Sequence, residues 1–269
     1  MKVTLLGTSG AWPIPEPACD CPQCAEARDA PRCRRTRACL RIETDDATVI
    51  VDPGPDVLHQ LEREGFRAAA DRVLITHTHG DHCFGLSDLV HVMRDRTAPL
   101  PVHAAAYHRQ RLIELFPTLA TGESPRIRYE VWKPGTRLEL AGVAIEGFET
   151  GHNADFPTTA LLMHLDTHLG FVRRIAYATD MGVVPDASRE ILRGIDLFVG
   201  DGGILGGPGH GHPGTDAVIA MAADLEVARV AFTHVGHLEL SDADLKEHLG
   251  PDVHLAYDGM DLRALLPDV

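Results

Sequence analysis

The chain has 269 residues, 44% hydrophobic and 24% charged, with a net charge of −14 when histidine is neutral. It is long enough to bury a substantial core, and no apolar run approaches the length that spans a bilayer. A protein that grips nucleic acid through phosphates usually presents a basic face, so the acidic balance argues against that class. We expect a cytoplasmic protein with no membrane partner. The acidic charge is still compatible with a small phosphorylated substrate.

Short β-type runs recur along the chain, with helical patterns between some of them. We expect strands at 2–6, 38–44, 47–52, 72–76, 101–104, 142–150, 159–165, 174–180, 196–201, 229–234 and 253–258. We expect helices at 55–64, 84–95, 105–116, 187–193, 215–225 and 241–249. No repeat or linker is evident, so this order predicts one layered α/β domain over 1–269, with two sheets and outer helices.

Polar side chains stand where several of these strands end. They are Asp52, His77, His152, Asp180, Asp201 and His234. Layered α/β folds place their sites at strand ends, because the sheet is rigid and the loops that follow can converge. The pattern therefore predicts a site at one edge of the sheets.

The segment "THTHGDH", residues 76–82, carries His77, His79, Asp81 and His82 within six residues. Gly80 lets the backbone bend so that these side chains can point to a common centre. Neutral imidazoles and carboxylates are ligands for Zn, Mn or Fe. We therefore interpret the segment as a metal-binding loop.

This segment resembles the signature of the metallo-β-lactamase superfamily, and the resemblance extends over nearly the whole chain. The other motif residues occur in the expected order, in "IVDPG", "ETGH", "YATD" and "FTHVGH". The resemblance implies the αββα sandwich, with two β-sheets face to face and helices outside.

The resemblance also implies a ligand set for two divalent metal ions, Mn²⁺ or Zn²⁺. His77, His79 and His152 would hold one ion, Asp81, His82 and His234 the other, and Asp180 would bridge them. Asp52 would orient a ligand by hydrogen bonding. The resemblance also makes Asp81 a catalytic residue. Two such ions lower the pKa of a shared water, polarise the substrate oxygen and neutralise developing charge.

Cysteines cluster in "CDCPQC", with Cys19, Cys21 and Cys24. Three thiolates leave a tetrahedral zinc one ligand short, and His237 in "FTHVGH" is a candidate for the fourth. The arrangement resembles the PhnP group of cyclic phosphodiesterases, in which these positions bind a structural zinc. We expect this zinc to pin the loop at about 8–37, which would otherwise be costly to order.

The glycine-rich stretch 201–218 follows a strand end and contains His210 and His212. Phosphodiesterase branches of the superfamily place a histidine just before the following helix, where it protonates the leaving oxygen. By position we assign this role to His212, with His210 as the alternative and Asp155 as a candidate partner. The N-terminus of the helix could also hold phosphate.

These features predict a metal-dependent phosphodiesterase acting on a small cyclic phosphate, of the 5-phosphoribosyl 1,2-cyclic phosphate type. The resemblance leaves two alternatives: an RNA-processing nuclease of the tRNase Z type, and a non-hydrolytic metalloprotein like PQQ-biosynthesis protein B. It further implies a homodimer. An ester or thioester hydrolase stays open, because metals polarise a carbonyl as readily as a phosphoryl group.

Overall fold

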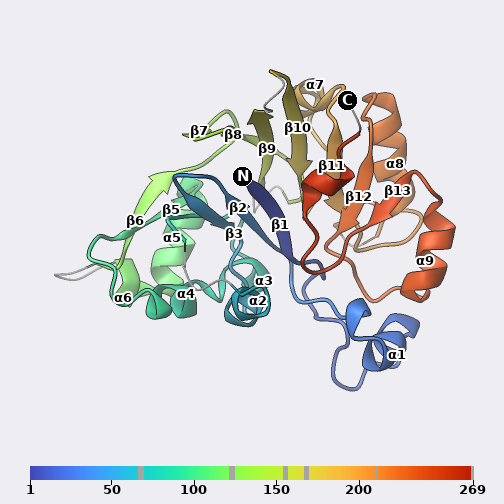
Figure 1. Cartoon of the computed structure of the whole chain (residues 1–269), viewed down its shortest axis with the longest axis horizontal. Helices are drawn as coiled ribbons and strands as arrows, with labels where there is room; N and C mark the ends of the chain where they lie inside the picture. Colours follow the sequence, from blue (N-terminus) through green and yellow to red (C-terminus); the bar gives the residue numbers. More distant parts are fainter. Residues whose placement is uncertain (66–69, 121–124, 154–156, 167–169, 210, 268–269) are drawn as a thin grey trace.

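Two β-sheets pack face to face with helices on both outer faces, which confirms the expected αββα sandwich (Figure 1). The computed structural model describes residues 1–65, 70–120, 125–153, 157–166, 170–209 and 211–267. Within those ranges, none of the helices has the length and apolarity that crossing a bilayer requires.

The first sheet has the order β1-β2-β3-β4-β5-β6. Its pairs β1–β2 and β2–β3 are antiparallel, and the remaining pairs are parallel. The strands are β1 (Lys2–Gly7), β2 (Cys39–Glu43), β3 (Thr48–Val51), β4 (Arg72–Leu74), β5 (Leu100–Ala104) and β6 (Ile127–Val131).

The second sheet has the order β13-β12-β11-β10-β9-β8-β7. Neighbours from β7 to β10 run antiparallel, and those from β10 to β13 run parallel. The strands are β7 (Arg137–Leu140), β8 (Val143–Glu149), β9 (Thr159–Asp166), β10 (Val172–Tyr177), β11 (Leu197–Asp201), β12 (Val230–Thr233) and β13 (Val253–Leu255).

Helices lie on the outer faces and in the connections. They are α1 (Pro22–Asp29), α2 (Val57–Arg63), α3 (Gly80–Cys83), α4 (Leu86–Val92), α5 (Ala106–Leu115), α6 (Pro117–Ala120), α7 (Asp186–Leu192), α8 (Thr215–Asp224) and α9 (Asp242–Leu249). Short 3₁₀ turns span Pro31–Cys33 and Leu262–Leu265. Apolar residues of α2, α4 and α5 pack on the first sheet, and those of α7, α8 and α9 pack on the second, whereas α1 lies apart from both sheets, near α9 (Figure 1).

The alternation of side chains along the strands builds this layering. In β11, Leu197 and Val199 enter the core between the two sheets, whereas Phe198 enters the core beneath the helices. In β3, Val51 likewise faces the other sheet and Ile50 faces the helices. Successive strand side chains point to opposite faces, so strands covered on both faces read as continuous apolar runs.

The segment 8–37 is held by more than its cysteines, and it contains a helix that the sequence did not reveal. Pro22 opens α1, and the Cys21 side chain caps it by accepting from the Cys24 backbone N–H. Beyond α1, the buried Arg35 guanidinium donates to Asp242 Oδ2 at 2.6 Å and to Thr8 Oγ1 at 3.0 Å. These contacts fasten the segment to the start of α9 (Figure 1).

Replacing Arg35 should therefore destabilise the fold strongly. Arg35→Met leaves the Asp242 carboxylate buried without its cation, and breaking such a pair typically costs about 3–5 kcal/mol. We expect urea titration to show that loss in the free energy of unfolding, with little change for the exposed control Arg32→Met. Equal stabilities of the two variants would show that the ion pair contributes nothing to the fold.

Candidate metal centre

The predicted strand-end residues meet at one edge of the sandwich, where both sheets contribute. Two of them, Asp52 with φ 55° and His234 with φ 53°, adopt the left-handed backbone conformation although neither is glycine. Such residues cost energy and persist only where surrounding structure enforces them, often at functional sites. At Gly151, with φ 66°, a Cβ would lie 2.0 Å from the Val183 carbonyl oxygen, so only glycine fits there.

Asp180 lies between two sets of imidazoles and presents one carboxylate oxygen to each. Oδ1 is 3.8 Å from His77 Nε2 and 3.6 Å from His152 Nε2. Oδ2 is 3.0 Å from His82 Nε2 and 3.3 Å from His234 Nε2. This is the arrangement expected of a carboxylate shared by two ions.

The "THTHGDH" segment supplies ligand atoms to both sets because of its local shape. His79 precedes α3 with an extended backbone, and its Nδ1 lies 2.9 Å from His77 Nε2. Asp81 and His82 belong to the short helix α3, with Asp81 Oδ2 3.1 Å from His82 Nε2. The change from extended chain to helix at Gly80 thus turns successive ligands towards different centres.

Two groups of ligand atoms result. His77, His79, His152 and Asp180 form one, and Asp81, His82 and His234 form the other, with the atoms of each group within 4.8 Å of one another. Two ligands of one ion at about 2.0–2.2 Å lie roughly 3–3.6 Å apart, and the closest pairs in each group, at 2.9 Å for His77–His79 and 3.1 Å for Asp81–His82, are near that spacing.

Asp52 is fully buried and fixes the ring of His82, as expected of an orienting residue. Its Oδ2 lies 2.9 Å from His82 Nδ1, and the Thr76 hydroxyl donates to the same oxygen at 2.7 Å. Its Oδ1 accepts from the Thr76 backbone N–H at 2.8 Å. With Nδ1 bound to Asp52, the Nε2 of His82 is turned to the centre, as in many metal-binding histidines.

The charges of the centre favour cations. Burial and the neighbouring His82 hold the pKa of His77 well below its ordinary value. Burial also opposes a proton on His82, but Asp180, Asp81 and Asp52 overcome it and hold that pKa well above the ordinary value. The pKa of Asp180 lies well below normal, because nearby imidazolium charge outweighs the effect of burial.

The residues therefore fit a pair of divalent ions. Among the described residues, the buried atoms His82 Nε2 and His234 Nε2 lie 3.0 and 3.3 Å from the buried Asp180 Oδ2, but none of the three has a partner in hydrogen-bonding geometry. Buried polar atoms without partners are costly, and coordination to a cation would satisfy all of them. The carboxylates that favour protons on these imidazoles would equally favour metal.

The cysteine cluster forms a second, separate centre. Sγ of Cys19, Cys21 and Cys24 lies 3.2, 3.7 and 3.4 Å from His237 Nδ1. A tetrahedral zinc would separate a sulfur from a nitrogen ligand by about 3.5 Å, so the four side chains fit one zinc. Burial raises the pKa of Cys24 to about 12, so its thiol keeps its proton near neutral pH unless a cation replaces it.

His212 lies beside the metal centre and is paired with Asp201, a partner that the sequence did not identify. His212 Nδ1 is 2.5 Å from Asp201 Oδ2, and this hydrogen bond raises the pKa of His212. Asp201 is buried at the end of β11, and its Oδ1 is 3.7 Å from His234 Nδ1. His210 and Asp155, the other candidates, lie outside the described residues.

The N-terminus of α8 is not a phosphate site, which corrects the expectation from sequence. The backbone N–H of Thr215 donates to the Ile204 carbonyl at 3.0 Å, and that of Asp216 to the Gly206 carbonyl at 3.3 Å. The close packing depends on Gly214, where a Cβ would lie 1.7 Å from the Gly206 oxygen. The glycine-rich loop therefore uses these donors itself.

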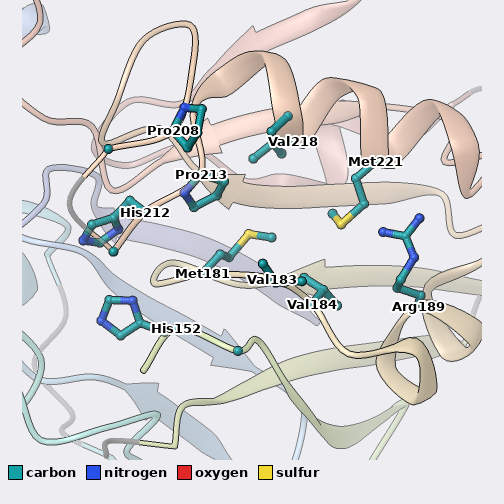
Figure 2. A pocket seen from close by; sticks show the side chains of 15 residues that line it. His152, Met181, Val183, Val184, Arg189, Pro208, His212, Pro213, Val218 and Met221 are labelled. Atoms are coloured by element: carbon teal, nitrogen blue, oxygen red, sulfur yellow. The ribbon is translucent and has the colours of Figure 1, made fainter. Parts of the chain in front are cut away.

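A cavity of about 580 Å³ opens beside the centre, between the loop after β10, the glycine-rich loop and α8 (Figure 2). His152 and His212 line one end, and Arg189 of α7 lines the other. A volume of this size suits a small-molecule site.

Comparison with known proteins agrees with this geometry. The family described as the beta-lactamase superfamily domain matches residues 47–235. The chain belongs to this superfamily. Its two-sheet sandwich is the metallo-β-lactamase fold that its motifs predicted.

Among solved structures, a diphosphatase from the PhnP family matches with a TM-score of 0.81 and 27% identity, covering 97% of this chain and 96% of that one. The chain is also similar in sequence to the following proteins. Porphyromonas gingivalis octanoyltransferase is 26% identical over 97% of this chain and 51% of its own length. Natronomonas pharaonis ribonuclease Z is 29% identical over 57% and 45%. Methylobacterium nodulans coenzyme PQQ synthesis protein B is 26% identical over 98% and 100%. The chain spans about half the length of the first two of these relatives.

Elemental analysis of variants should separate the two centres. We expect Cys24→Ser to lose one zinc and keep the ions of the His/Asp centre, because the clusters share no ligand. Asp180→Ala should lose catalytic ions and keep that zinc. Cys33→Ser removes a buried thiol outside the cluster and serves as the control. An unchanged metal content in Cys24→Ser would refute the zinc assignment.

Proposed function

We propose that this protein is a metal-dependent phosphodiesterase that hydrolyses a small phosphodiester. The observation that carries the proposal is the position of His212. Paired with Asp201, it stands beside both ligand sets, with a ring nitrogen within 4.8 Å of a carboxylate oxygen of Asp180 and of a ring nitrogen of His234. A hydrolase that expels an alkoxide needs an acid at that position.

Two ions held by the seven ligands, His77, His79, Asp81, His82, His152, Asp180 and His234, would polarise the phosphoryl oxygen and activate water. The side chains of this protein orient the ligands and exclude water. Asp52 keeps the ring of His82 oriented, and the burial of Asp52 and Asp180 keeps bulk water from competing.

In the proposed reaction a water oxygen bonds to phosphorus and the bond from phosphorus to the leaving oxygen breaks. His212 delivers its ring proton to that oxygen, so that an alcohol rather than an alkoxide departs. Asp201 supports this step, because its hydrogen bond raises the pKa of His212 and fixes the orientation of the ring. The water then supplies the proton that returns His212 to its starting state.

The PhnP-family likeness supports phosphorus chemistry, since that relative is described as a diphosphatase. The 5-phosphoribosyl 1,2-cyclic phosphate expected from the sequence is one candidate for this reaction.

Replacing His212 tests the assignment of the acid. Loss of a general acid typically lowers a rate by about 10²–10⁴-fold, and we expect His212→Gln to lower kcat for bis(4-methylphenyl) phosphate in that range. His248→Gln, on the exposed face of α9, is the matched control and should keep full activity. A His212→Gln enzyme with nearly normal kcat would exclude this role.

The reaction class itself is tested on metal-loaded protein given phosphodiesters and an octanoyl thioester side by side. We expect turnover of the phosphodiesters. The alternative of acyl hydrolysis would be favoured by turnover of the thioester alone. Intact, metal-loaded protein that cleaves neither would support a non-hydrolytic role like that of PQQ synthesis protein B.

Ribonuclease Z relatives raise RNA as a substrate, which we propose this protein does not use. Its net charge of −14 opposes RNA, because affinity for a polyanion depends on neutralising phosphates. We therefore expect no salt-dependent retention of tRNA in a filter-binding titration. Tight binding that weakens steeply with salt, accompanied by cleavage, would instead favour the nuclease function.

A further inference from the structure

The cavity beside the metal centre differs in chemistry from one end to the other. Figure 2 shows His152 and His212 at one end, with Met181, Val183 and Val184 along one side. Pro213 of the glycine-rich loop, together with Val218 and Met221 of α8, lies on the opposite side. Beyond the histidines the walls are therefore apolar for most of their length.

Positive charge is scarce along these walls. Among the described residues that line the cavity, Arg189 is the single side chain with a fixed charge. Its guanidinium already donates to Asp224 Oδ2 at 2.7 Å, at the solvent edge. A phosphate at this far end would have to compete with that carboxylate for one guanidinium.

Three of the backbone donors at the cavity are already used. The N–H of Gly182 donates to the Thr150 carbonyl at 3.1 Å. Those of Gly209 and His212 donate to each other's carbonyl oxygens at 3.1 and 2.8 Å. These three N–H groups at the cavity are thus committed within the chain. A second phosphate on the substrate, as on a phosphorylated ribose, could use these three donors only by displacing their present partners.

We propose that this cavity binds an apolar substituent of the substrate, so that the enzyme acts on an alkyl or aryl phosphodiester rather than on a sugar with a second phosphate. The inference rests on the proposed function, because it takes the reacting phosphate to lie at the metal centre. Since the cavity begins at His212, the apolar group belongs to the alcohol whose oxygen receives the proton.

The walls would then contribute binding through the hydrophobic effect. Each methylene moved from water into such a site is worth about a three- to fourfold gain in affinity until the space is filled. The cavity volume of about 580 Å³ accommodates a chain of several carbons or an aromatic ring. A ribose ring buried against methionine and valine would instead lose the hydrogen bonds that its hydroxyl groups make with water.

Direct binding to the Mn²⁺-loaded protein tests this without requiring turnover. Isothermal titration calorimetry would compare methyl, propyl and pentyl phosphate with ribose 5-phosphate, which has the same number of carbons as the pentyl ester. We expect affinity to rise with chain length, and pentyl phosphate to bind at least about tenfold more tightly than methyl phosphate. It should also bind more tightly than ribose 5-phosphate.

Variants should locate the effect in the cavity. Met221→Gln keeps the length of the side chain but makes its end polar, and should weaken pentyl phosphate by about threefold or more while sparing methyl phosphate. Ala220→Gln adds the same amide at the exposed neighbouring position outside the cavity and is the control. Val183→Asn changes a second residue of the wall. Because Val183 is 88% exposed, this substitution carries little risk to folding.

The possible outcomes separate this inference from the proposed function. If affinity does not change with chain length, or ribose 5-phosphate binds most tightly, the apolar site is wrong even where phosphodiesters are cleaved. If chain length matters but no phosphodiester is cleaved, the cavity stands and the proposed reaction fails. Equal effects of Met221→Gln and Ala220→Gln would also overturn the assignment of the cavity.

Discussion

A buried carboxylate between two sets of imidazoles is the constraint on which the site depends. Asp180 is 2% exposed, and a carboxylate so far from water is costly unless cationic groups compensate it. Its two oxygens face different histidines, which come from both sheets. The two sheets must therefore hold β10 and the loop after β4 in a fixed relative position before this charge can be neutralised. The same buried charges thus determine both the stability of this edge and its ability to bind metal.

The cysteine cluster extends the same constraint to the N-terminal segment. His234, at the metal centre, and His237, at the cysteine cluster, lie three residues apart in the turn after β12. A zinc held by Cys19, Cys21, Cys24 and His237 would fix one end of that turn. The strained backbone of His234, with φ 53°, would then be supported from outside the centre. The same segment also meets this turn directly, because the Gly10 N–H donates to the Val235 carbonyl at 3.0 Å and the Val235 N–H donates to the Thr8 carbonyl at 2.8 Å.

Much of this arrangement was predictable because it rests on local signals. The apolar strands and their polar last residues are visible in the sequence, and a shared motif orders the ligands along the chain. Strands β6 and β7 escaped because their residues are mostly half-buried or exposed and lack a strong apolar pattern. Helix α1 escaped because it is polar and is organised by the cysteine cluster. The pairing of His212 with Asp201 joins a loop to a strand end, and no local pattern encodes that contact.

The superfamily motif constrains the chemistry of the reaction much more than the identity of the substrate. The ligands converge on the metal centre, so the same residues could serve any ester that reaches it. Selection among esters falls to side chains outside the motif, here Met181, Val184, Val218 and Met221, which the resemblance does not describe. Their apolar character favours a substrate without a second charge. Met221 on α8 is only partly buried, so it is the member of this set that can change with least disturbance to Asp180 and the second sheet. A common metal centre can in this way serve relatives with different substrates.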